Sequence, residues 1–351
     1  MNGTPVDVVA LGESMVTFRP TVPGRLADVP SFDRGIGGAE SNVACVLAAG
    51  GHPTRWVSRV GADGFGDHLV EAIGGYGVDV GAVRRDPARP TGIYFRTAGD
   101  RGGDSHEVAY YRAGSAASAM SATNMDLGAL RAGRVLHLSG ITAALSADCL
   151  GLLGTLLERR PGAPDGPLVS FDVNHRPGLW RTPGDARVLL DLARRADLVF
   201  VGEDEAEDAW GVTGGPDAIR AALPEPSLLV VKQGSAGAVA YDRSAGERRH
   251  FEPAPRVDVV AAVGAGDAFA AGFLSATLRG LPAAARLRHG HLWAAAALTV
   301  PGDLAAPPSR AHADRLTALD TGAWGTLHLG PGWTEATEAA DSGAAEEVRT
   351  P

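Results

Sequence analysis

Residues 168–201 begin with the apolar run LVSF (168–171), continue through ARVLLDLA (186–193), whose apolar residues follow helical spacing, and end with a second apolar run, LVFV (198–201). Continuous apolar strands on either side of a helix are typical of a parallel sheet, because such strands are buried on both faces and need a crossover helix. The chain repeats this pattern with further apolar runs at 6–11, 135–138 and 228–231 and a further helix-type segment at 149–157. The sequence therefore predicts an α/β fold, a doubly wound and mostly parallel sheet with helices on both faces.

Two segments interrupt this alternation. Residues 15–36 are rich in Pro, Gly and alternating apolar residues, and residues 91–112 contain two strand-type runs, 92–97 and 108–112, around a polar turn at 99–105. Neither segment supplies a crossover helix, so we expect both to form a small β lid on a domain that spans residues 1–324. Residues 325–351 are rich in Gly, Ala, Thr and acidic residues, and we expect this tail to be disordered.

The amino-acid composition and net charge of the chain bear on which classes of partner it can have. The 351 residues carry a net charge of −9, and we expect no nucleic-acid partner because phosphate backbones bind clustered positive charge. Cys45 and Cys149 lie in apolar surroundings without metal-ligand spacing, which indicates a reducing compartment. The apolar run at 293–300 is too short to cross a bilayer, so we expect no membrane partner and a cytoplasmic protein. Lys232 is the only lysine, which excludes a Schiff-base or phosphate-loop lysine elsewhere.

The chemistry is concentrated in the segment VGAGDAF (263–269), which precedes an apolar helix-type stretch at 270–278. Small residues before a helix leave the first backbone N–H groups open, and these groups favour an anion together with the helix dipole. A carboxylate beside an anion site is unfavourable, because like charges repel. Its presence is explained if it accepts the proton of a hydroxyl while the amides stabilise a transferring phosphoryl group. We assign the base role to Asp267 and the amides to Gly264, Ala265 and Gly266. A plain helix N-cap is the alternative interpretation of Asp267.

This segment resembles the signature of the ribokinase (PfkB) family of carbohydrate kinases. Gly37-Gly38 followed by Asn42 resembles the sugar-binding motif of the same family, and the resemblance covers about residues 5–320. Four further stretches, GGAE (37–40), YYRAGSA (110–116), LHLSGIT (136–142) and DVNHR (172–176), are similar to the branch that acts on 2-keto-3-deoxygluconate. The resemblance implies ATP-dependent, Mg²⁺-requiring phosphorylation of this sugar acid at its 6-hydroxyl. A carboxylate substrate suits guanidinium groups, which bind it through paired hydrogen bonds.

The resemblance also implies which residues form the site. The substrate side comprises Gly38, Asn42, Tyr94, Tyr110, Arg112, Asn174 and Arg176. The nucleotide side comprises Lys232, Gly234, Gly237, His291 and Asp303, and Glu205 is implied for magnesium. Each group has a structural alternative: ion pairs for the arginines, aromatic filling of the lid for the tyrosines, a glycine-rich hairpin turn at 232–237 and a packed helix position for His291.

Three positions depart from the family pattern and keep other functions open. Gly202 stands where many members have Asn, Ala261 where many have Asp, and His291 where many have Asn near the adenine. A neutral-sugar kinase of the fructokinase or ribokinase type is the first alternative, and a sugar-acid sensor without catalysis is the second. A dinucleotide oxidoreductase is a third and weaker alternative. An exposed lid strand also predicts a homo-oligomer that pairs through the lid.

Overall fold

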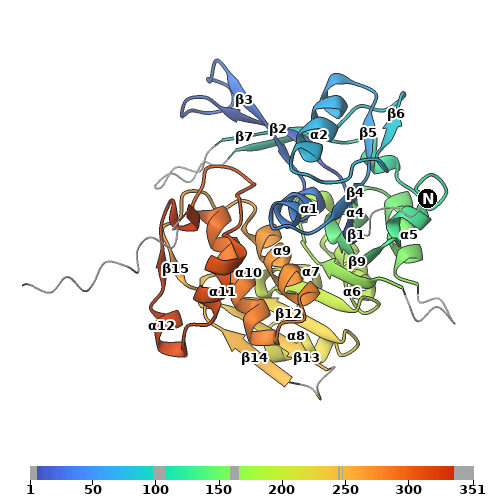
Figure 1. The fold of residues 1–351 in the computed structure, drawn as a ribbon. Coiled ribbons are helices and arrows are strands. Elements are labelled where there is room, and N and C mark those ends of the chain that lie inside the picture. The colour runs from blue at the N-terminus through green and yellow to red at the C-terminus, as the bar shows by residue number, and fades with distance from the viewer. Residues whose placement is uncertain (1–5, 98–106, 159–165, 244–245, 247, 336–351) are drawn as a thin grey trace, which may run out of the picture.

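An eight-stranded sheet forms the centre of the molecule (Figure 1), and the structure, a computed structural model, describes residues 6–97, 107–158, 166–243, 246 and 248–335. The strand order is β14-β13-β12-β11-β10-β9-β1-β4. Neighbours from β4 to β12 are parallel, and β13 and β14 add an antiparallel edge. The strands are β1 Val6–Leu11, β4 Thr54–Val57, β9 Gly133–Ser139, β10 Leu168–Asp172, β11 Leu198–Gly202, β12 Leu228–Lys232, β13 Ala238–Asp242 and β14 Arg248–Glu252. The predicted mostly parallel sheet is confirmed.

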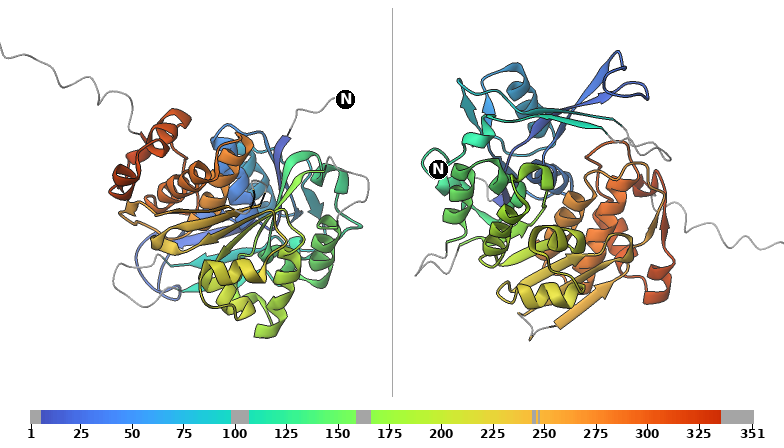
Figure 2. Two further views of the ribbon diagram at one scale, coloured as in Figure 1. Left: turned by 90° about the horizontal axis from the view of Figure 1, so that it is seen from below. Right: turned by 180° about the vertical axis from the view of Figure 1, so that it is seen from behind.

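Helices cover both faces of this sheet (Figure 2, left). They are α1 Ala39–Ala49, α2 Gly64–Gly75, α3 Leu127–Leu130, α4 Gly140–Leu145, α5 Ala147–Leu156, α6 Val188–Ala193, α7 Glu203–Trp210, α8 Pro216–Ala222, α9 Ala265–Leu278, α10 Ala283–Leu298, α11 Arg310–Thr317 and α12 Thr321–Gly325. One core lies between the sheet and α5 to α8, and a second lies between the sheet and α1, α9 and α10. Burial on both faces explains why the central strands are apolar throughout.

The lid is a separate four-stranded sheet with the order β3-β2-β7-β8. Its strands are β2 Met15–Pro20, β3 Phe32–Gly37, β7 Ile93–Arg96 and β8 Val108–Tyr111. Side chains alternate along these strands, so Tyr94 and Tyr110 pack together on one face while Phe18 and Phe95 stack on the other. The expected segments therefore form the lid, whereas the polar turn expected at 99–105 lies outside the described residues.

The end of the described chain differs from our expectation. Residues after 324 continue in ordered structure, because β16 (His328–Leu329) pairs with β15 (Arg256–Val257) and Leu329 is buried. The prediction of disorder from residue 325 is thus wrong for residues 325–335, and residues 336–351 lie outside the described part. This strand could not be predicted from the sequence, because two residues are too few to show an alternation of apolar and polar side chains. A second small pair joins β5 (Arg59–Gly61) to β6 (Arg84–Asp86).

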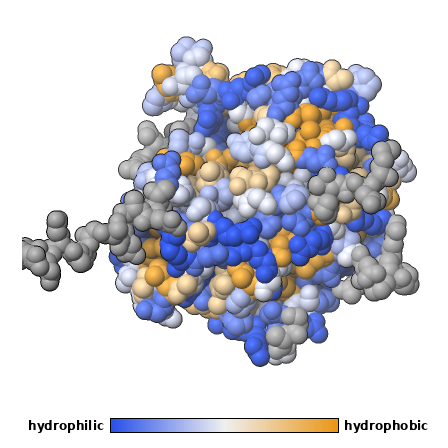
Figure 3. All heavy atoms as spheres, in the orientation of Figure 1, coloured by the Kyte–Doolittle hydropathy of each residue, from blue (hydrophilic) through white to orange (hydrophobic). Residues whose placement is uncertain are grey.

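The outer surface mixes chemical characters. Among the described residues visible in Figure 3, apolar side chains form separate patches between hydrophilic ones. Within the same described ranges, none of the helices combines the length and the apolar composition that a bilayer crossing requires.

Candidate active site

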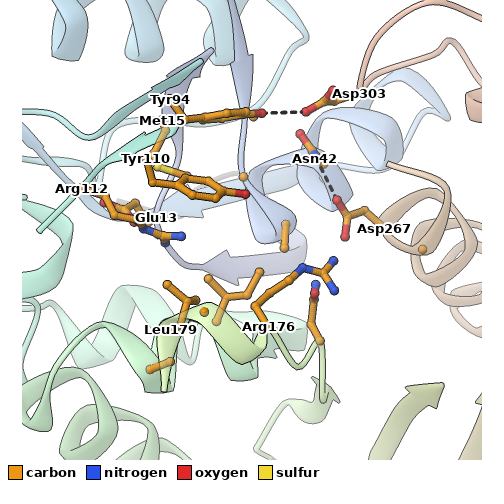
Figure 4. A pocket seen from close by; sticks show the side chains of 18 of the residues that line it. Glu13, Met15, Asn42, Tyr94, Tyr110, Arg112, Arg176, Leu179, Asp267 and Asp303 are labelled. Atoms are coloured by element: carbon orange, nitrogen blue, oxygen red, sulfur yellow. Dashed lines mark hydrogen bonds and ion pairs between the residues drawn. The ribbon is translucent and has the colours of Figure 1, made fainter. Parts of the chain in front are cut away.

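A cavity of about 860 Å³ lies between the lid, the carboxyl ends of the central strands and the start of α9. This volume falls in the range of small-molecule sites. Figure 4 shows that side chains from these three parts converge on it: Tyr94, Tyr110 and Arg112 from the lid side, Arg176 from the loop after β10, and Asp267 from α9. The position agrees with the rule that ligands of open α/β sheets bind beyond the carboxyl ends of the strands.

Asp267 lies in the first turn of α9, on the cavity wall. The helix is capped by Gly264, so Asp267 occupies the third helical position and the N-cap alternative is wrong. The amide Nδ2 of Asn42 donates a hydrogen bond of 2.8 Å to Oδ2 of Asp267. The pKa of Asp267 is raised to about 7, mainly by burial; the hydrogen bond from Asn42 opposes this rise and the negative charge of Asp172 adds to it. A carboxyl group with such a pKa is suited to accept a proton near neutral pH.

The turn before Asp267 depends on Gly264. This residue has a φ of 78°, and a Cβ atom there would lie 2.2 Å from the backbone oxygen of Asp303. The amide of Ala268 donates to the carbonyl of Gly264, at 2.9 Å, so the amides before it lie outside the helical hydrogen-bond ladder. Since Gly264, Ala265 and Gly266 all line the cavity, the turn can hold an anion beside Asp267.

Arg112 follows β8 and is tied to a residue that the sequence analysis missed. Its Nε donates to Oε2 of Glu13 at 2.8 Å, and a second nitrogen completes the ion pair. The Glu13 side chain is fully buried and also accepts a hydrogen bond of 2.5 Å from Ser115 Oγ. Arg112 is therefore part of a structural ion pair, and it lines the cavity as well. Glu13 follows the apolar run at 6–11, and a polar residue after a predicted strand was the signal that could have found it.

The loop after β10 brings Asn174 and Arg176 to the cavity as expected. Asn174 has a φ of 37°, a left-handed conformation that Asn tolerates better than most residues, and its buried Oδ1 has no hydrogen-bond partner among the described residues. The Arg176 side chain is 56% exposed, and its nearest carboxylate oxygen, on Glu205, is 4.0 Å away. Arg176 is consequently the guanidinium that is more available to a ligand.

Three charged residues gather at the ends of β10, β11 and β12. Lys232 Nζ lies 3.1 Å from Asp172 Oδ1 and 3.9 Å from Glu205 Oε2, and all three residues line the cavity. Burial raises the pKa of Glu205, while the charge of Lys232 opposes the shift. Among the described residues there is no cluster of three or more His, Cys, Asp or Glu that suits a metal ion by itself. The two carboxylates do fit Mg²⁺, which proteins often bind through one or two carboxylates together with substrate phosphates.

The structure places several predicted nucleotide residues in structural roles. His291 is buried, donates to the carbonyl of Glu252 at 3.1 Å and packs edge-on against Phe269, so it is a packed helix residue. Gly234 and Gly237 have φ values of 57° and 139°, which the hairpin between β12 and β13 requires. None of these three residues is among the residues that line the cavity.

Asp303 and Gly38 line the cavity, but their contacts differ from our expectation. Asp303 accepts a hydrogen bond of 2.9 Å from Tyr94 Oη and an ion pair from Arg96, so it fastens a lid strand and leaves less of its carboxylate for a nucleotide. A Cβ atom on Gly38 would lie 2.4 Å from the backbone oxygen of Glu13. Packing inside the chain thus explains this glycine, whether or not a sugar approaches it.

The fold and this cavity define a phosphoryl-transfer enzyme of the carbohydrate kinase type, and comparison with known proteins agrees. Residues 6–310 match the pfkB family of carbohydrate kinases. The chain belongs to this family.

Individual relatives are similar over most of their length. A 2-dehydro-3-deoxygluconokinase of Bacillus subtilis (strain 168) is 36% identical over 312 residues, which cover 87% of this chain and 93% of the relative. Fructokinase-1 of Oryza sativa subsp. japonica is 32% identical over 271 residues, or 76% of this chain and 81% of the relative. The crystal structure of 2-dehydro-3-deoxygluconokinase from Thermotoga maritima superimposes with a TM-score of 0.79 at 25% identity, covering 90% of this chain and 99% of that chain.

Proposed function

We propose that this protein phosphorylates 2-keto-3-deoxygluconate, also called 2-dehydro-3-deoxygluconate, at its 6-hydroxyl, with ATP as the phosphoryl donor. The observation that carries the proposal is that a carboxyl group with a pKa of about 7, Asp267, shares one cavity with the available guanidinium of Arg176. The first group suits an alcohol acceptor, and the second suits the carboxylate at the other end of a sugar acid. The relatives that act on this compound support the same substrate.

The chemical step assigns a role to each part of the site. Asp267 accepts the proton of the 6-hydroxyl while the oxygen of that hydroxyl attacks the γ-phosphorus of ATP. The bond between this phosphorus and the β,γ-bridging oxygen breaks, and ADP is released. The backbone amides of Gly264, Ala265 and Gly266 stabilise the charge on the moving phosphoryl group. Asn42 orients Asp267 through its 2.8 Å hydrogen bond. Asp172 and Glu205 line the cavity and would hold Mg²⁺, which would supply positive charge to neutralise the nucleotide phosphates.

The lid supplies the remaining contacts. Tyr110 is 55% exposed, and the guanidinium of Arg112 lies 5.9 Å from the centre of the Tyr110 ring. Both side chains can therefore contact a sugar from the lid side of the cavity. Tyr94 is buried behind Tyr110 and supports it. A sugar held between the lid and Asp267 would be shielded from water, which otherwise accepts the phosphoryl group.

One observation favours a neutral sugar as the alternative substrate. Glu13 neutralises Arg112. Among the described arginines that line the cavity, this leaves Arg176, whose nearest carboxylate oxygen is 4.0 Å away, to bind a substrate carboxylate. ADP release should therefore be measured with 2-keto-3-deoxygluconate, its galactonate epimer, fructose and ribose side by side. A kcat/KM at least about tenfold higher for a sugar acid supports the proposal. A preference for fructose or ribose contradicts it, and ligand binding without ADP release favours a sensor.

We also infer a homo-oligomer that pairs through the lid. The edge strand β8 exposes Val108 and Tyr111, and Tyr111 is 64% exposed while packing on Phe95. An unpaired strand with apolar side chains pairs readily with a second copy. Sedimentation equilibrium of the parent and of Tyr111→Lys tests this: the parent should be a dimer or larger and the variant a monomer. A monomeric parent contradicts the inference.

A further inference from the structure

The single lysine of the chain is the last residue of β12, and its side chain points into the active-site cavity. The Lys232 side chain is 20% exposed, and its Nζ donates to both carboxylate oxygens of Asp172, at 3.1 and 3.3 Å. Glu205 Oε2 lies 3.9 Å away. Every other basic side chain that carries a permanent charge in this sequence is an arginine. Lysine differs from arginine in being a compact point charge with three rotatable donors, which can exchange one partner for another.

The side of Lys232 that faces the catalytic turn is open. A Cβ atom built on Gly266 would have only Lys232 Nζ within 4 Å, at 3.9 Å, when its chain neighbours and its own helix are set aside. The ammonium group therefore faces Gly266 within the cavity that both residues line. An oxygen atom placed between them can accept hydrogen bonds from the turn and from Lys232 together, given that each such bond is about 2.9 Å long.

The charge of this group is secured by its neighbours. Two carboxylates face the ammonium group, with Asp172 Oδ1 at 3.1 Å and Glu205 Oε2 at 3.9 Å. In the absence of nucleotide, its charge balances the carboxylates of Asp172 and Glu205.

We propose that Lys232 is a catalytic residue whose ammonium group exchanges a carboxylate contact for an oxygen of the phosphoryl group that moves from ATP to the sugar. This inference rests on the proposed kinase function and names a residue that acts in it. The transferring group carries its charge on three equatorial oxygens. The backbone amides of the turn approach these oxygens from one side, and Lys232 approaches them from the side of β12.

A purely structural role is the competing explanation. In that case Lys232 would only neutralise Asp172 and Glu205, and the nature of the bound nucleotide would not change its surroundings. The two roles differ in their dependence on the γ-phosphate, because ADP fills the rest of the nucleotide site but lacks the transferred group.

Since the chain has one lysine, protein labelled with carbon-13 at lysine Cε gives a single lysine signal in a carbon NMR spectrum. The signal is recorded for the free protein, with Mg²⁺ and ADP, and with Mg²⁺ and a non-hydrolysable ATP analogue. We expect the analogue to shift the signal clearly beyond its position with ADP. The same position with both nucleotides would overturn the proposal.

Nucleotide affinities of matched variants provide the second measurement. Lys232→Met should lose about tenfold to a hundredfold in affinity for the analogue and much less for ADP, whereas Lys232→Arg should retain most of the difference. If Lys232→Met fails to fold because two carboxylates lose their partner, the double variant Lys232→Met/Asp172→Asn removes one of them. Equal losses for both nucleotides would show that Lys232 is structural. These measurements contain no sugar, so a wrong sugar assignment leaves them unchanged, while absence of nucleotide binding in the parent refutes the kinase function itself.

Discussion

The side-chain amide of Asn42 donates a hydrogen bond of 2.8 Å to the carboxylate of Asp267, although the two residues are 225 positions apart in the chain. Asn42 lies in the first turn of α1, and Asp267 lies in the first turn of α9 (Figure 4). The bond occupies Oδ2 of Asp267, so we expect Oδ1 to take the proton of the substrate. Two helices that pack against each other thereby fix the orientation of the base.

Replacement of the base tests its role directly. Asp267→Asn should lower kcat by about two to four powers of ten, because an amide cannot accept the proton but keeps the shape of the side chain. The circular dichroism spectrum should stay that of the parent. Glu71→Gln, a change of an exposed carboxyl group on α2, is the matched control and should keep full activity. A kcat for Asp267→Asn within about threefold of the parent would remove Asp267 from the mechanism.

The pH dependence of kcat should report the same group. Because burial raises the pKa of Asp267 to about 7, kcat should rise with pH through a midpoint near 7 and level off at higher pH, as the carboxyl group loses its proton. Asn42→Ala removes the hydrogen bond that lowers this pKa, so the rising limb should move to higher pH. An unchanged limb in Asn42→Ala would contradict the assignment.

The contribution of Asp267 to the stability of the fold should fall as the pH rises, whereas kcat should increase. The folded protein holds the proton of Asp267 up to about pH 7, whereas the unfolded chain releases it near pH 4, so this contribution is complete below about pH 4 and is lost as the pH rises through 7. Asp267→Asn should therefore have a higher Tm than the parent above about pH 7, and the difference should shrink toward pH 4. Thermal unfolding across this pH range measures it, and a variant less stable than the parent above pH 7 contradicts it.

The two arginines of the cavity should separate binding from stability. Arg176→Ala should raise the KM for the sugar acid by about ten- to a hundredfold and leave the Tm nearly unchanged, because its side chain is half exposed. Arg112→Ala should lower the free energy of unfolding by about 3–5 kcal/mol, because it leaves the buried Glu13 carboxylate without its cation. Kinetics with varied sugar acid and chemical denaturation of both variants measure these effects. A larger loss of stability for Arg176→Ala than for Arg112→Ala would reverse the assignment.

The glycine at the catalytic turn should not tolerate a side chain. Gly264→Ala combines a φ of 78° with a Cβ atom 2.2 Å from the Asp303 backbone oxygen, so the turn must shift and its amides move away from Asp267. We expect a large loss of kcat together with a lower Tm. Gly151→Ala is the control, because no atom lies within 4 Å of its Cβ position in the middle of α5, and it should keep its activity and gain slightly in stability. Parent-like kcat in Gly264→Ala would show that the turn amides do not act.

Contacts within the chain bear on several residues that the sequence analysis named or missed. His291 and Gly237 were assigned to the nucleotide from a resemblance, but the structure turns His291 toward the carbonyl of Glu252 and packs Gly237 against the same backbone oxygen. The ion pair of Glu13 was missed because its partner, Arg112, is 99 positions away in the chain. The strand at His328–Leu329 is defined by its pairing with Arg256 and Val257, about 70 positions earlier in the chain.

The sequence by itself determined the α/β architecture, the segments of the lid, and the turn that places Asp267 behind three small residues at the start of a helix. These features follow from the period of apolar residues and from the conformations that glycine permits, both of which are properties of neighbouring residues in the chain. Only the tertiary structure decided that Glu13 neutralises Arg112 and that Asp303 fastens Tyr94 and Arg96 of the lid. Ion pairs and shifted pKa values depend on which distant side chains are desolvated together, and that is settled when the lid, the strand ends and α9 close around one cavity.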